Sequence, residues 1–444
     1  MAQRLNSTFV ATRKTSNSMW KKPDNPLPLN PSQVVIGLYV WLDLKWDEHP
    51  FFSSRFLVKT AKDVAIIKSL DIAGKFFYYP EHSSAEPGVV ALTAVNLPKS
   101  AEAEADAALA LEIRALEKEK EAKQRALRAT AARADQAWSD AAHATKSALN
   151  DMSRSPKVAG KLLVDLSTET AAIVSKGHEV LLHLLGDKRE QGPQFHALNT
   201  MTLSMLVGKK AGLSERELAD LAVAALAHDA GESQIPQQIV KNPQRKKHEE
   251  DFFRQHVAFS VQYASESGAF SPAALGTIAD HHEAIDGSGW PKGKRDAQIG
   301  IGARILAMVD RYDTLCSPDT LKTAPLMPAE ALATMFCNES SRMDKSLLSL
   351  LIKLLGVYPP GTVVQLSDGA LALVIAPGAT SLKPTVLLYS PEMSKDDAPT
   401  VDLAHAGDLK IAEAIRPSTL PPDVLQWLSP QQRLSYFFSV DEGK

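Results

Sequence analysis

The sequence predicts a mainly helical protein, with a small α+β module before the helices and a small β module after them. Residues 99–155 contain neither Gly nor Pro and are rich in Ala, Glu, Lys and Arg, which favour helices. Residues 158–355 keep a helical spacing of apolar side chains, interrupted by short turn signals. From residue 362 onwards, apolar residues flank an Asp-Gly pair, which is typical of a β-hairpin.

Length and composition place the chain in a broad class. With 444 residues it should form roughly two to four domains. Apolar residues make up 44% and charged residues 23%, as in globular proteins, and no apolar run reaches the roughly 18 residues that a membrane span needs. The net charge of −3 argues against DNA, RNA or a membrane surface as the main partner. Two cysteines are too few for a disulfide framework, so we expect a reducing, cytoplasmic location.

The N-terminal part should comprise two segments. Residues 1–30 are rich in Ser, Thr, Asn, Lys and Pro and are expected to form a disordered arm. Residues 31–97 are expected to form a small α+β regulatory module, with strands at 34–40, 56–58 and 76–79 and a helix at 64–70. This module is too short to be an obvious catalytic platform.

Residues 98–155 are expected to form an Ala-rich helical linker. Four of its residues are spaced eleven apart, namely Leu116, Leu127, Trp138 and Leu149. An 11-residue period suits a nearly straight helical packing seam. A solvated spacer helix and a coil that forms a homodimer are both compatible with this pattern.

The helical region that follows carries ionisable residues on faces that should be buried. In the helix that ends near residue 229, the apolar stripe through Leu218 and Leu226 leads at helical spacing to Asp229, and His228 lies beside it. Other apolar stripes lead in the same way to His196, His256, His282 with His281 adjacent, and Asp310.

These residues predict a metal site. A single histidine on an apolar face is more simply explained as a hydrogen-bonded core residue. However, a buried carboxylate is costly unless it is paired or binds a metal. Five histidines and two aspartates that point inward from consecutive helices are hard to explain by packing alone. Imidazole and carboxylate together suit divalent iron, manganese or zinc, and the set is also that of a two-metal site.

Other candidate sites are weaker. His178 and His183 lie in a leucine-rich segment that we expect to be helical, where no carboxylate is aligned with them, so packing or surface contact explains them. The chain has no G-x-x-x-x-G-K-[ST] loop and no G-x-S-x-G elbow. Nucleotide-triphosphate motors and serine hydrolases are therefore unsupported.

The C-terminal part changes from helical to β periodicity. Residues 356–416 are expected to form a small β module, with strands at 362–366, 370–375 and 384–389. Residues 417–444 are polar and are expected to form a tail.

An ordered set of motifs runs through the helical region, and consists of His196; His228-Asp229; His256; His281-His282-Glu283; Asp286-Gly287-Ser288-Gly289-Trp290-Pro291; Arg304-Ile305; and Asp310. This set resembles the HD-GYP domain, a helical subclass of the HD phosphohydrolases that hydrolyse the bacterial second messenger cyclic di-GMP. The resemblance covers about residues 160–345, within an expected domain of 156–355. The segment Trp46-Asp47-Glu48-His49-Pro50-Phe51 resembles the domain of uncharacterised function that often precedes HD-GYP domains in bacteria.

The resemblance implies a phosphodiesterase that cleaves cyclic di-GMP to linear pGpG, GMP or both. It implies two divalent ions, most simply iron or manganese, held by His196, His228, Asp229, His256, His281, His282 and Asp310. Asp229 is expected to bridge the ions, which would stabilise the incoming and leaving oxygens of an in-line displacement. The remaining residues assigned to catalysis are Glu232 and Arg304. The substrate should be bound by Gly289, Trp290, Pro291, Lys292 and Arg304.

Three departures from the family pattern stand out. Glu232 takes the place of a lysine that would meet the scissile phosphate. Trp290 replaces the tyrosine of Gly-Tyr-Pro, which keeps an aromatic ring but loses the hydroxyl. Gly192 occupies the position of a glutamate that holds a third ion in some members, which favours two ions.

These departures leave a second function open. The chain could be a degenerate, non-catalytic member that senses cyclic di-GMP. It could also bind diguanylate cyclases or other signalling proteins through the loop Gly289-Trp290-Pro291.

Overall fold

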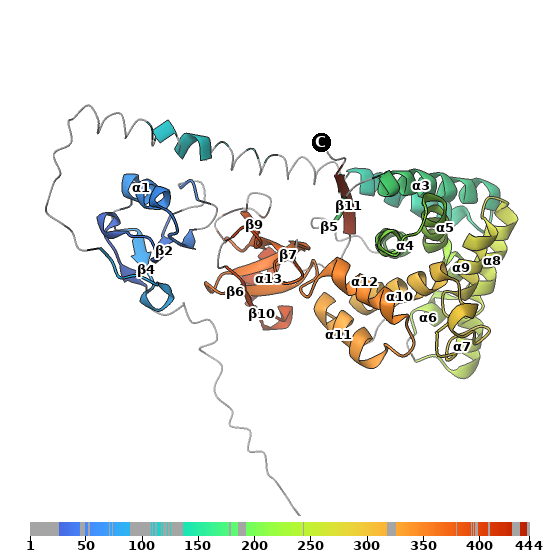
Figure 1. Ribbon diagram of the computed structural model, residues 1–444. Coiled ribbons are helices and arrows are strands. Elements are labelled where there is room, and N and C mark those ends of the chain that lie inside the picture. Colours follow the sequence, from blue (N-terminus) through green and yellow to red (C-terminus); the bar gives the residue numbers. More distant parts are fainter. Residues whose placement is uncertain are drawn as a thin grey trace, which may run out of the picture. The chain divides into compact units, whose positions relative to one another are not determined.

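The computed structural model describes residues 26–44, 49–51, 54–70, 72, 74–88, isolated positions between 108 and 125, 136–176, 179–184, 192–242, 244–317, 326–378, most of 380–428, and 436–441. The chain divides into two compact units, one of residues 1–49 and 54–111 and one of residues 50–53 and 112–444. Figure 1 labels their elements. Among the described residues, no helix is both long and apolar enough to cross a membrane.

The N-terminal unit contains a four-stranded antiparallel sheet with the order β1-β4-β2-β3. Its elements are β1 (Leu27–Pro28), β2 (Tyr39–Leu42), β3 (Arg55–Leu57), α1 (Ala61–Ser69) and β4 (Phe76–Tyr78). The predicted helix and the two later strands are confirmed. The first strand was predicted to begin at Val34, which is wrong, because residues 36 and 37 form a turn and the strand begins only at Tyr39.

In the second unit, residues 136–151 form a helix. Trp138 of this helix is buried and stacks on Phe195, with ring centroids 5.0 Å apart and planes 6° from parallel. Ala142 and Met152 are buried in the same hydrophobic cluster. This part of the Ala-rich segment therefore packs against the helical domain of its own chain, which neither the spacer nor the dimer interpretation anticipated. Leu127 lies outside the described residues.

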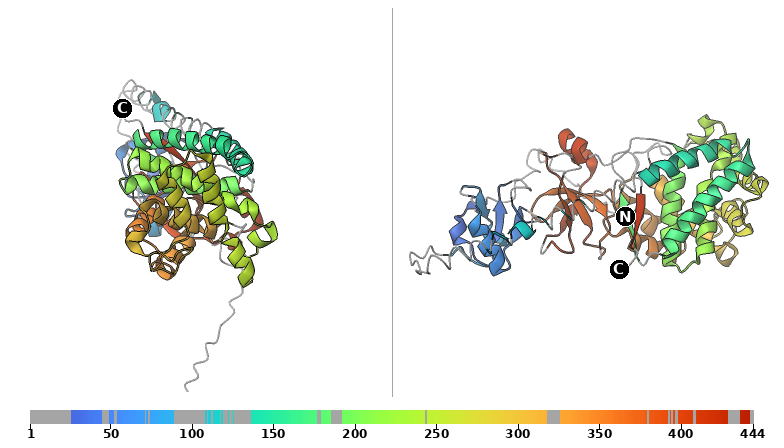
Figure 2. Two further views of the ribbon diagram at one scale, coloured as in Figure 1. Left: turned by 90° about the vertical axis from the view of Figure 1, so that its right-hand side faces the viewer. Right: turned by 90° about the horizontal axis from the view of Figure 1, so that it is seen from above.

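The helical domain surrounds one buried helix. Its helices are α3 (Pro156–Lys176), α4 (Pro193–Lys210), α5 (Glu215–Ala227), α6 (Gln237–Val240), α7 (Lys247–Phe253), α8 (His256–Ser267), α9 (Pro272–Asp280), α10 (Ile301–Cys316), α11 (Pro328–Asn338) and α12 (Lys345–Leu355). Of the 18 residues of α4, 14 are buried, and α3, α5, α10 and α12 pack around it. Figure 2 shows this bundle from two further directions.

Two parts of the helical prediction are wrong. Glu179–Leu184 forms a strand, β5, that pairs antiparallel with β11 (Tyr436–Asp441) near the C-terminus. A short apolar run can form either a helix or a strand. Here it forms a strand because it pairs with a strand from the far end of the chain. The stripe through His256 is also interrupted, because α7 ends at Phe253 and α8 begins at His256.

The C-terminal β module is a five-stranded antiparallel sheet with the order β10-β6-β7-β8-β9. Its strands are β6 (Val363–Leu366), β7 (Leu371–Ala376), β8 (Thr385–Leu388), β9 (Thr400–Asp402) and β10 (Ile411–Ala414). The predicted hairpin is confirmed, and Gly369 adopts the positive φ of 81° that its turn requires. Residues 417–428 do not form a free tail, because α13 (Pro422–Leu428) packs Val424 and Leu428 on one face of the sheet.

Candidate metal centre

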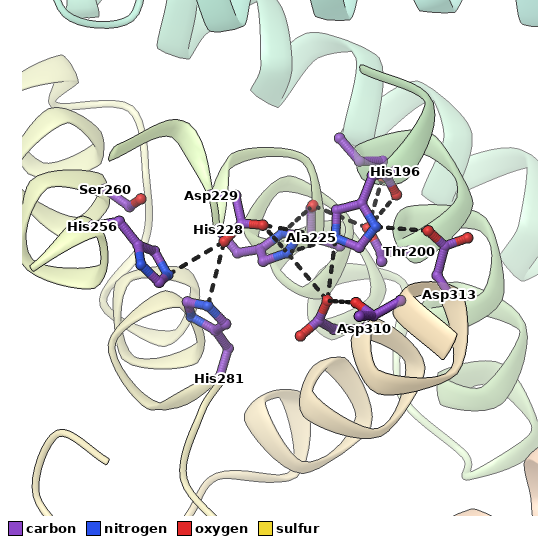
Figure 3. Close-up of polar contacts among 12 residues, drawn as sticks. His196, Thr200, Ala225, His228, Asp229, His256, Ser260, His281, Asp310 and Asp313 are labelled. Carbon is purple, nitrogen blue, oxygen red and sulfur yellow. Dashed lines mark hydrogen bonds and ion pairs between the residues drawn. The ribbon is translucent and has the colours of Figure 1, made fainter. Parts of the chain in front are cut away.

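The helical domain brings all seven expected donor residues together. They come from five places in the fold: His196 from α4, His228 and Asp229 from the turn after α5, His256 from the start of α8, His281 and His282 from the end of α9, and Asp310 from α10. Figure 3 shows most of them converging. Their donor atoms form two groups, and within each group the atoms lie within 4.8 Å of one another. One group is His196, His228 and Asp310, and the other is Asp229, His256, His281 and His282.

Asp229 lies between the two groups. Its Oδ2 is 3.3 Å from Nε2 of His228, and its Oδ1 is 3.4 Å from Nε2 of His256. Oδ1 also lies 3.7 Å from Nε2 of His281. Because each carboxylate oxygen faces a different group, this side chain can offer one oxygen to each of two ions.

A glycine makes this arrangement possible. The turn after α5 carries Asp229 and packs directly on the first turn of α8. A Cβ atom at Gly231 would lie 2.1 Å from the carbonyl oxygen of His256 and 2.6 Å from the backbone nitrogen of Ser260. The backbone N–H of Gly231 instead donates to Oγ of Ser260 at 2.8 Å. Only a residue without a side chain lets Asp229 approach His256 this closely.

Backbone carbonyls orient three of the histidines. Nδ1 of His228, His256 and His281 donates to the carbonyl oxygens three residues earlier, at 2.8, 2.7 and 2.6 Å respectively. Because Nδ1 carries the hydrogen, the lone pair of such a ring in its neutral form is on Nε2, which faces the centre. Nε2 of His281 is buried and has no hydrogen-bond partner among the described residues. A buried polar atom without a partner is costly, and a cation in the centre would provide one.

His196 is oriented by a carboxylate that the sequence analysis missed. Its Nδ1 donates to Oδ2 of Asp313 at 2.7 Å, and Nδ2 of Asn199 donates to the other oxygen of Asp313 at 2.8 Å. Burial alone would lower the pKa of His196, but hydrogen bonds to Asp310 and Asp313 raise it to about 10. Asp313 lies three residues after Asp310 on the same helix, so helical spacing could have indicated it.

Two further histidines, His256 and His282, and the central Asp229 are in states that suit metal binding. Burial lowers the pKa of His256 to about 4. Burial and the neighbouring His281 and His256 also lower the pKa of His282. These imidazoles are therefore neutral near pH 7. Burial by itself would raise the pKa of Asp229, but the surrounding histidines hold it well below its usual range, so this carboxylate is charged.

Nitrogen and oxygen donors in this number fit two divalent transition-metal ions, such as iron, manganese or zinc. Two close approaches support the fit. Nε2 of His196 lies 3.2 Å from Nε2 of His228, and Nε2 of His282 lies 3.2 Å from Nε2 of His256. Since His228 and His256 carry their lone pairs on Nε2, a cation can be bound where these nitrogens converge.

Glu232 lies beside this centre. Burial and the negative charge of Asp229 raise its pKa to about 8. Asp310 adds to the rise, whereas His196 and His228 oppose it. The residue at the expected position of a phosphate-binding lysine is therefore a carboxylic acid, and it interacts electrostatically with the donor residues.

The expected substrate loop is attached to the donor residues. The ring of Trp290 stacks on His282, with centroids 4.1 Å apart and planes at 29°. Glu283 is buried, and its two carboxylate oxygens accept the backbone N–H groups of Lys292 and Lys294 at 2.7 and 2.9 Å. A Cβ atom at Gly289 would lie 2.2 Å from the backbone nitrogen of Ala284, so the loop packs tightly against the donor segment. Pro291 and the side chain of Lys292 are exposed.

Arg304 lines a cavity next to the donor residues, but its guanidinium is already engaged. Nη1 lies 3.1 Å from Oδ2 of Asp344, and Nε donates to the carbonyl oxygen of Ile299 at 2.8 Å. The same cavity is lined by Arg311 and Arg342, which the sequence analysis did not single out. His178 lies outside the described residues, and so does the side chain of His183.

Two family models match the chain. The model described as HD domain matches residues 179–347, and the model described as a domain of unknown function, DUF3391, matches residues 29–162. The first match lies within residues 156–355, where the helical domain is expected. The second includes the expected N-terminal module and continues through the Ala-rich segment beyond its expected end at residue 97.

Several curated proteins are similar in sequence. A cyclic di-GMP phosphodiesterase of Pseudomonas aeruginosa is 26% identical over 389 residues, which are 85% of this chain and 88% of that protein. The cyclic di-GMP phosphodiesterase response regulator RpfG of Xanthomonas campestris is 31% identical, over 33% of this chain and 39% of its own. The 3′3′-cGAMP-specific phosphodiesterase 3 of Vibrio cholerae is 28% identical, over 37% of this chain and 35% of its own. The chain thus spans most of the first relative and less than half of the other two.

Proposed function

Because this chain belongs to the HD-GYP family of HD-domain proteins, we propose that it is a metal-dependent phosphodiesterase that hydrolyses cyclic di-GMP to linear pGpG, GMP or both. The observation that carries the proposal is the position of Asp229, whose two oxygens face two separate groups of histidines. That arrangement suits a pair of ions that share one carboxylate. The choice of substrate follows from the relatives that share this domain, because their names include cyclic dinucleotides as substrates.

The ligand set consists of two halves around Asp229. His196, His228 and Asp310 would hold one ion, and His256, His281 and His282 would hold the other. Iron or manganese would suit these nitrogen and oxygen donors. When bound, two such ions stabilise the attacking and leaving oxygens of an in-line displacement at phosphorus.

The remaining residues of the site position the substrate. Trp290 is kept beside His282 by stacking, so a nucleobase that contacts this ring would lie next to the donor cluster. Glu283 holds the backbone of the loop in place. Arg304 lines the adjacent cavity and is oriented by Asp344.

Glu232 modulates the reaction. A lysine at this position would attract the scissile phosphate, whereas an ionised carboxylate repels it, by roughly 4 kcal/mol at about 4 Å and an effective dielectric of 20. In the metal-free centre, burial and the charge of Asp229 raise the pKa of Glu232 to about 8, which favours the uncharged carboxyl and opposes this repulsion. We expect turnover that is slower than with a lysine but not abolished.

A binding-only role is less well supported. It would explain Glu232 and Trp290, but not the retention and convergence of all seven donor residues. Binding of signalling proteins through the Gly289–Pro291 loop and a cytoplasmic site of action remain compatible with hydrolysis.

One experiment tests the proposal. The purified full chain is analysed for bound iron and manganese, and turnover of cyclic di-GMP and of 3′3′-cGAMP is measured in the wild type, Asp229→Ala and Glu232→Lys. We expect metal and turnover in the wild type, loss of both in Asp229→Ala, and faster turnover in Glu232→Lys. Asp251→Ala, an exposed aspartate on α7, is the matched control and should behave as the wild type.

The outcomes separate the alternatives. A wild type that holds metal without turnover, and gains it only in Glu232→Lys, would rule out the active enzyme. Turnover that persists in Asp229→Ala would contradict the bridging role. Turnover of 3′3′-cGAMP alone would change the substrate and keep the mechanism.

A further inference from the structure

A cavity of about 110 Å³ opens beside the donor cluster. Its lining includes three donor residues, His281, His282 and Asp310, and three arginines, Arg304, Arg311 and Arg342. The arginines come from α10 and from the turn between α11 and α12. A cavity that joins a metal centre to a cluster of guanidinium groups is suited to an anion that extends beyond the reacting atoms.

Two of the arginines are held in ion pairs. Nη1 of Arg304 lies 3.1 Å from Asp344, which also caps the start of α12. Arg311 makes a two-point contact with Glu339, with nitrogen–oxygen distances of 2.6 and 2.9 Å. These pairs offset the charges of Arg304 and Arg311 and hold their guanidinium groups in fixed positions at the cavity wall.

Arg342 differs from the other two. Its side chain is exposed and makes no hydrogen bond or ion pair within 4.0 Å among the residues that the structure describes. The carboxylates of Asp286 and Glu339 interact with it only at longer range. Among the three arginines that line the cavity, Arg304 and Arg311 are each paired with a carboxylate at close range, whereas in the described part of the chain Arg342 is not.

The backbone of Arg342 is nevertheless fixed next to the centre. Its carbonyl oxygen accepts the N–H of Ile285 at 3.1 Å, three residues after His282. Its own N–H donates to the carbonyl oxygen of Glu339 at 3.0 Å. A side chain that starts from an anchored backbone and ends in an unpaired guanidinium loses less freedom on binding than one on a mobile loop.

We propose that Arg342 binds the second phosphate of a cyclic dinucleotide, the one that is not cleaved, and that the cavity beside it is the corresponding subsite. A cyclic dinucleotide carries two phosphodiesters, and only one of them can lie at the paired donors. The other phosphodiester needs a cation close enough to be reached across the macrocycle of the dinucleotide. A guanidinium is suitable because it binds phosphate through two parallel hydrogen bonds. The inference rests on the proposed function, because it assumes that the substrate reacts at the donor cluster.

The test compares a substrate with two phosphates with one that has a single phosphate. Steady-state kinetics of Arg342→Ala, Arg342→Lys and the wild type are measured with cyclic di-GMP and with bis(p-nitrophenyl) phosphate. Because a hydrogen bond to a charged group is worth about 10-fold or more in affinity, we expect Arg342→Ala to raise the KM for cyclic di-GMP by about that factor. The kcat should change less than the KM, and the effect on bis(p-nitrophenyl) phosphate should be smaller. Arg342→Lys should restore part of the lost affinity.

Matched controls keep the result specific. Arg216→Ala removes an exposed arginine of α5 that does not line the cavity, and its KM should equal that of the wild type. Bound metal and thermal unfolding are measured for every variant, so that a folding defect is recognised. Equal losses on both substrates, or no change in KM for cyclic di-GMP, would overturn the proposal.

The proposed function and this inference can fail separately. If the wild type hydrolyses neither substrate, the proposed function fails. Calorimetric binding of cyclic di-GMP to the wild type and to Arg342→Ala then still decides the role of Arg342. An unchanged affinity in Arg342→Ala would reject the subsite even when hydrolysis is intact.

Discussion

The carboxylate of Asp313 accepts a hydrogen bond from Nδ1 of His196 at 2.7 Å, while Nε2 of the same ring lies 3.2 Å from Asp310. Asp313 is buried, and Asn199 holds its other oxygen. This carboxylate therefore fixes the orientation of His196 and makes its ring more basic, as outer carboxylates do around metal-binding histidines. Figure 3 shows the pair at the edge of the donor cluster.

Replacement of Asp313 should weaken metal binding without removing a donor. We expect Asp313→Ala to lower the affinity for Mn²⁺ by roughly 10- to 100-fold. The measurement is a competition titration with a chelator of known affinity. Asp313→Asn should have a smaller effect, because the amide oxygen can still accept the hydrogen bond. Asp251→Ala serves as the control, and an unchanged affinity in Asp313→Ala would show that Asp313 does not act through His196.

Metal should stabilise the helical domain. An ion that binds only the folded state at about 100 times its Kd adds about 2.7 kcal/mol to the free energy of unfolding. It would also provide a partner for the buried Nε2 of His281. Thermal unfolding with added Mn²⁺ should therefore occur at a higher temperature than with a chelator. In Asp229→Asn, the midpoint of thermal unfolding should be nearly the same with Mn²⁺ as with a chelator. If Mn²⁺ raises the midpoint of this variant as much as that of the wild type, the ions bind elsewhere.

Glu283 should control substrate binding through the loop that it holds. Its two oxygens accept two backbone N–H groups, whereas a glutamine has only one acceptor oxygen. We expect Glu283→Gln to raise the KM for cyclic di-GMP by about 10-fold while bound metal stays near the wild-type amount. Glu266→Gln, an exposed glutamate on α8, is the control. Loss of metal in Glu283→Gln would instead indicate that Glu283 supports the donor residues.

Trp138 should stabilise the helical domain even though it lies in the Ala-rich segment. It is 7% exposed and stacks on Phe195. Removal of a buried aromatic side chain costs about 3 kcal/mol or more, so Trp138→Ala should lower the free energy of unfolding by that amount. Phe336→Ala removes an aromatic side chain that is 58% exposed and should change it by less than about 0.5 kcal/mol. Equal effects of the two would mean that the helix at 136–151 is not part of this core.

The ion pair of Arg311 and Glu339 should make stability depend on pH in the acid range. Hydrogen bonds from Arg311 lower the pKa of Glu339 below its ordinary value of 4.5. A carboxyl with a lowered pKa stabilises the fold above its unfolded pKa, and this contribution disappears as the pH falls through its folded pKa. The difference in unfolding free energy between the wild type and Glu339→Gln should therefore be largest near pH 6 and should disappear below about pH 4. The metal-free protein is used for this measurement, with Glu266→Gln as the control. A gap that is constant with pH would contradict the ion pair.

Local sequence patterns predicted most of the donor set. Helical spacing placed Asp229 and Asp310 on apolar faces, and the structure brings these residues together with His196, His228, His256, His281 and His282. The turn Asp368-Gly369 likewise predicted the hairpin of β6 and β7. Such features are readable because a helix or a tight turn depends on residues a few positions apart, and the chemistry of each residue is known from its type.

The tertiary structure decided what depends on distant segments. Asp313 orients His196 from a different helix, Gly231 allows α8 to approach Asp229, and Arg342 enters the cavity from the turn after α11. The strand Glu179–Leu184 pairs with Tyr436–Asp441, and Trp138 packs on Phe195. Each of these contacts joins residues far apart in the chain, so its energy comes from packing and pairing that no local period encodes. The sequence by itself thus determined which residues could bind metal, and the fold determined which residues position them and where a substrate can extend.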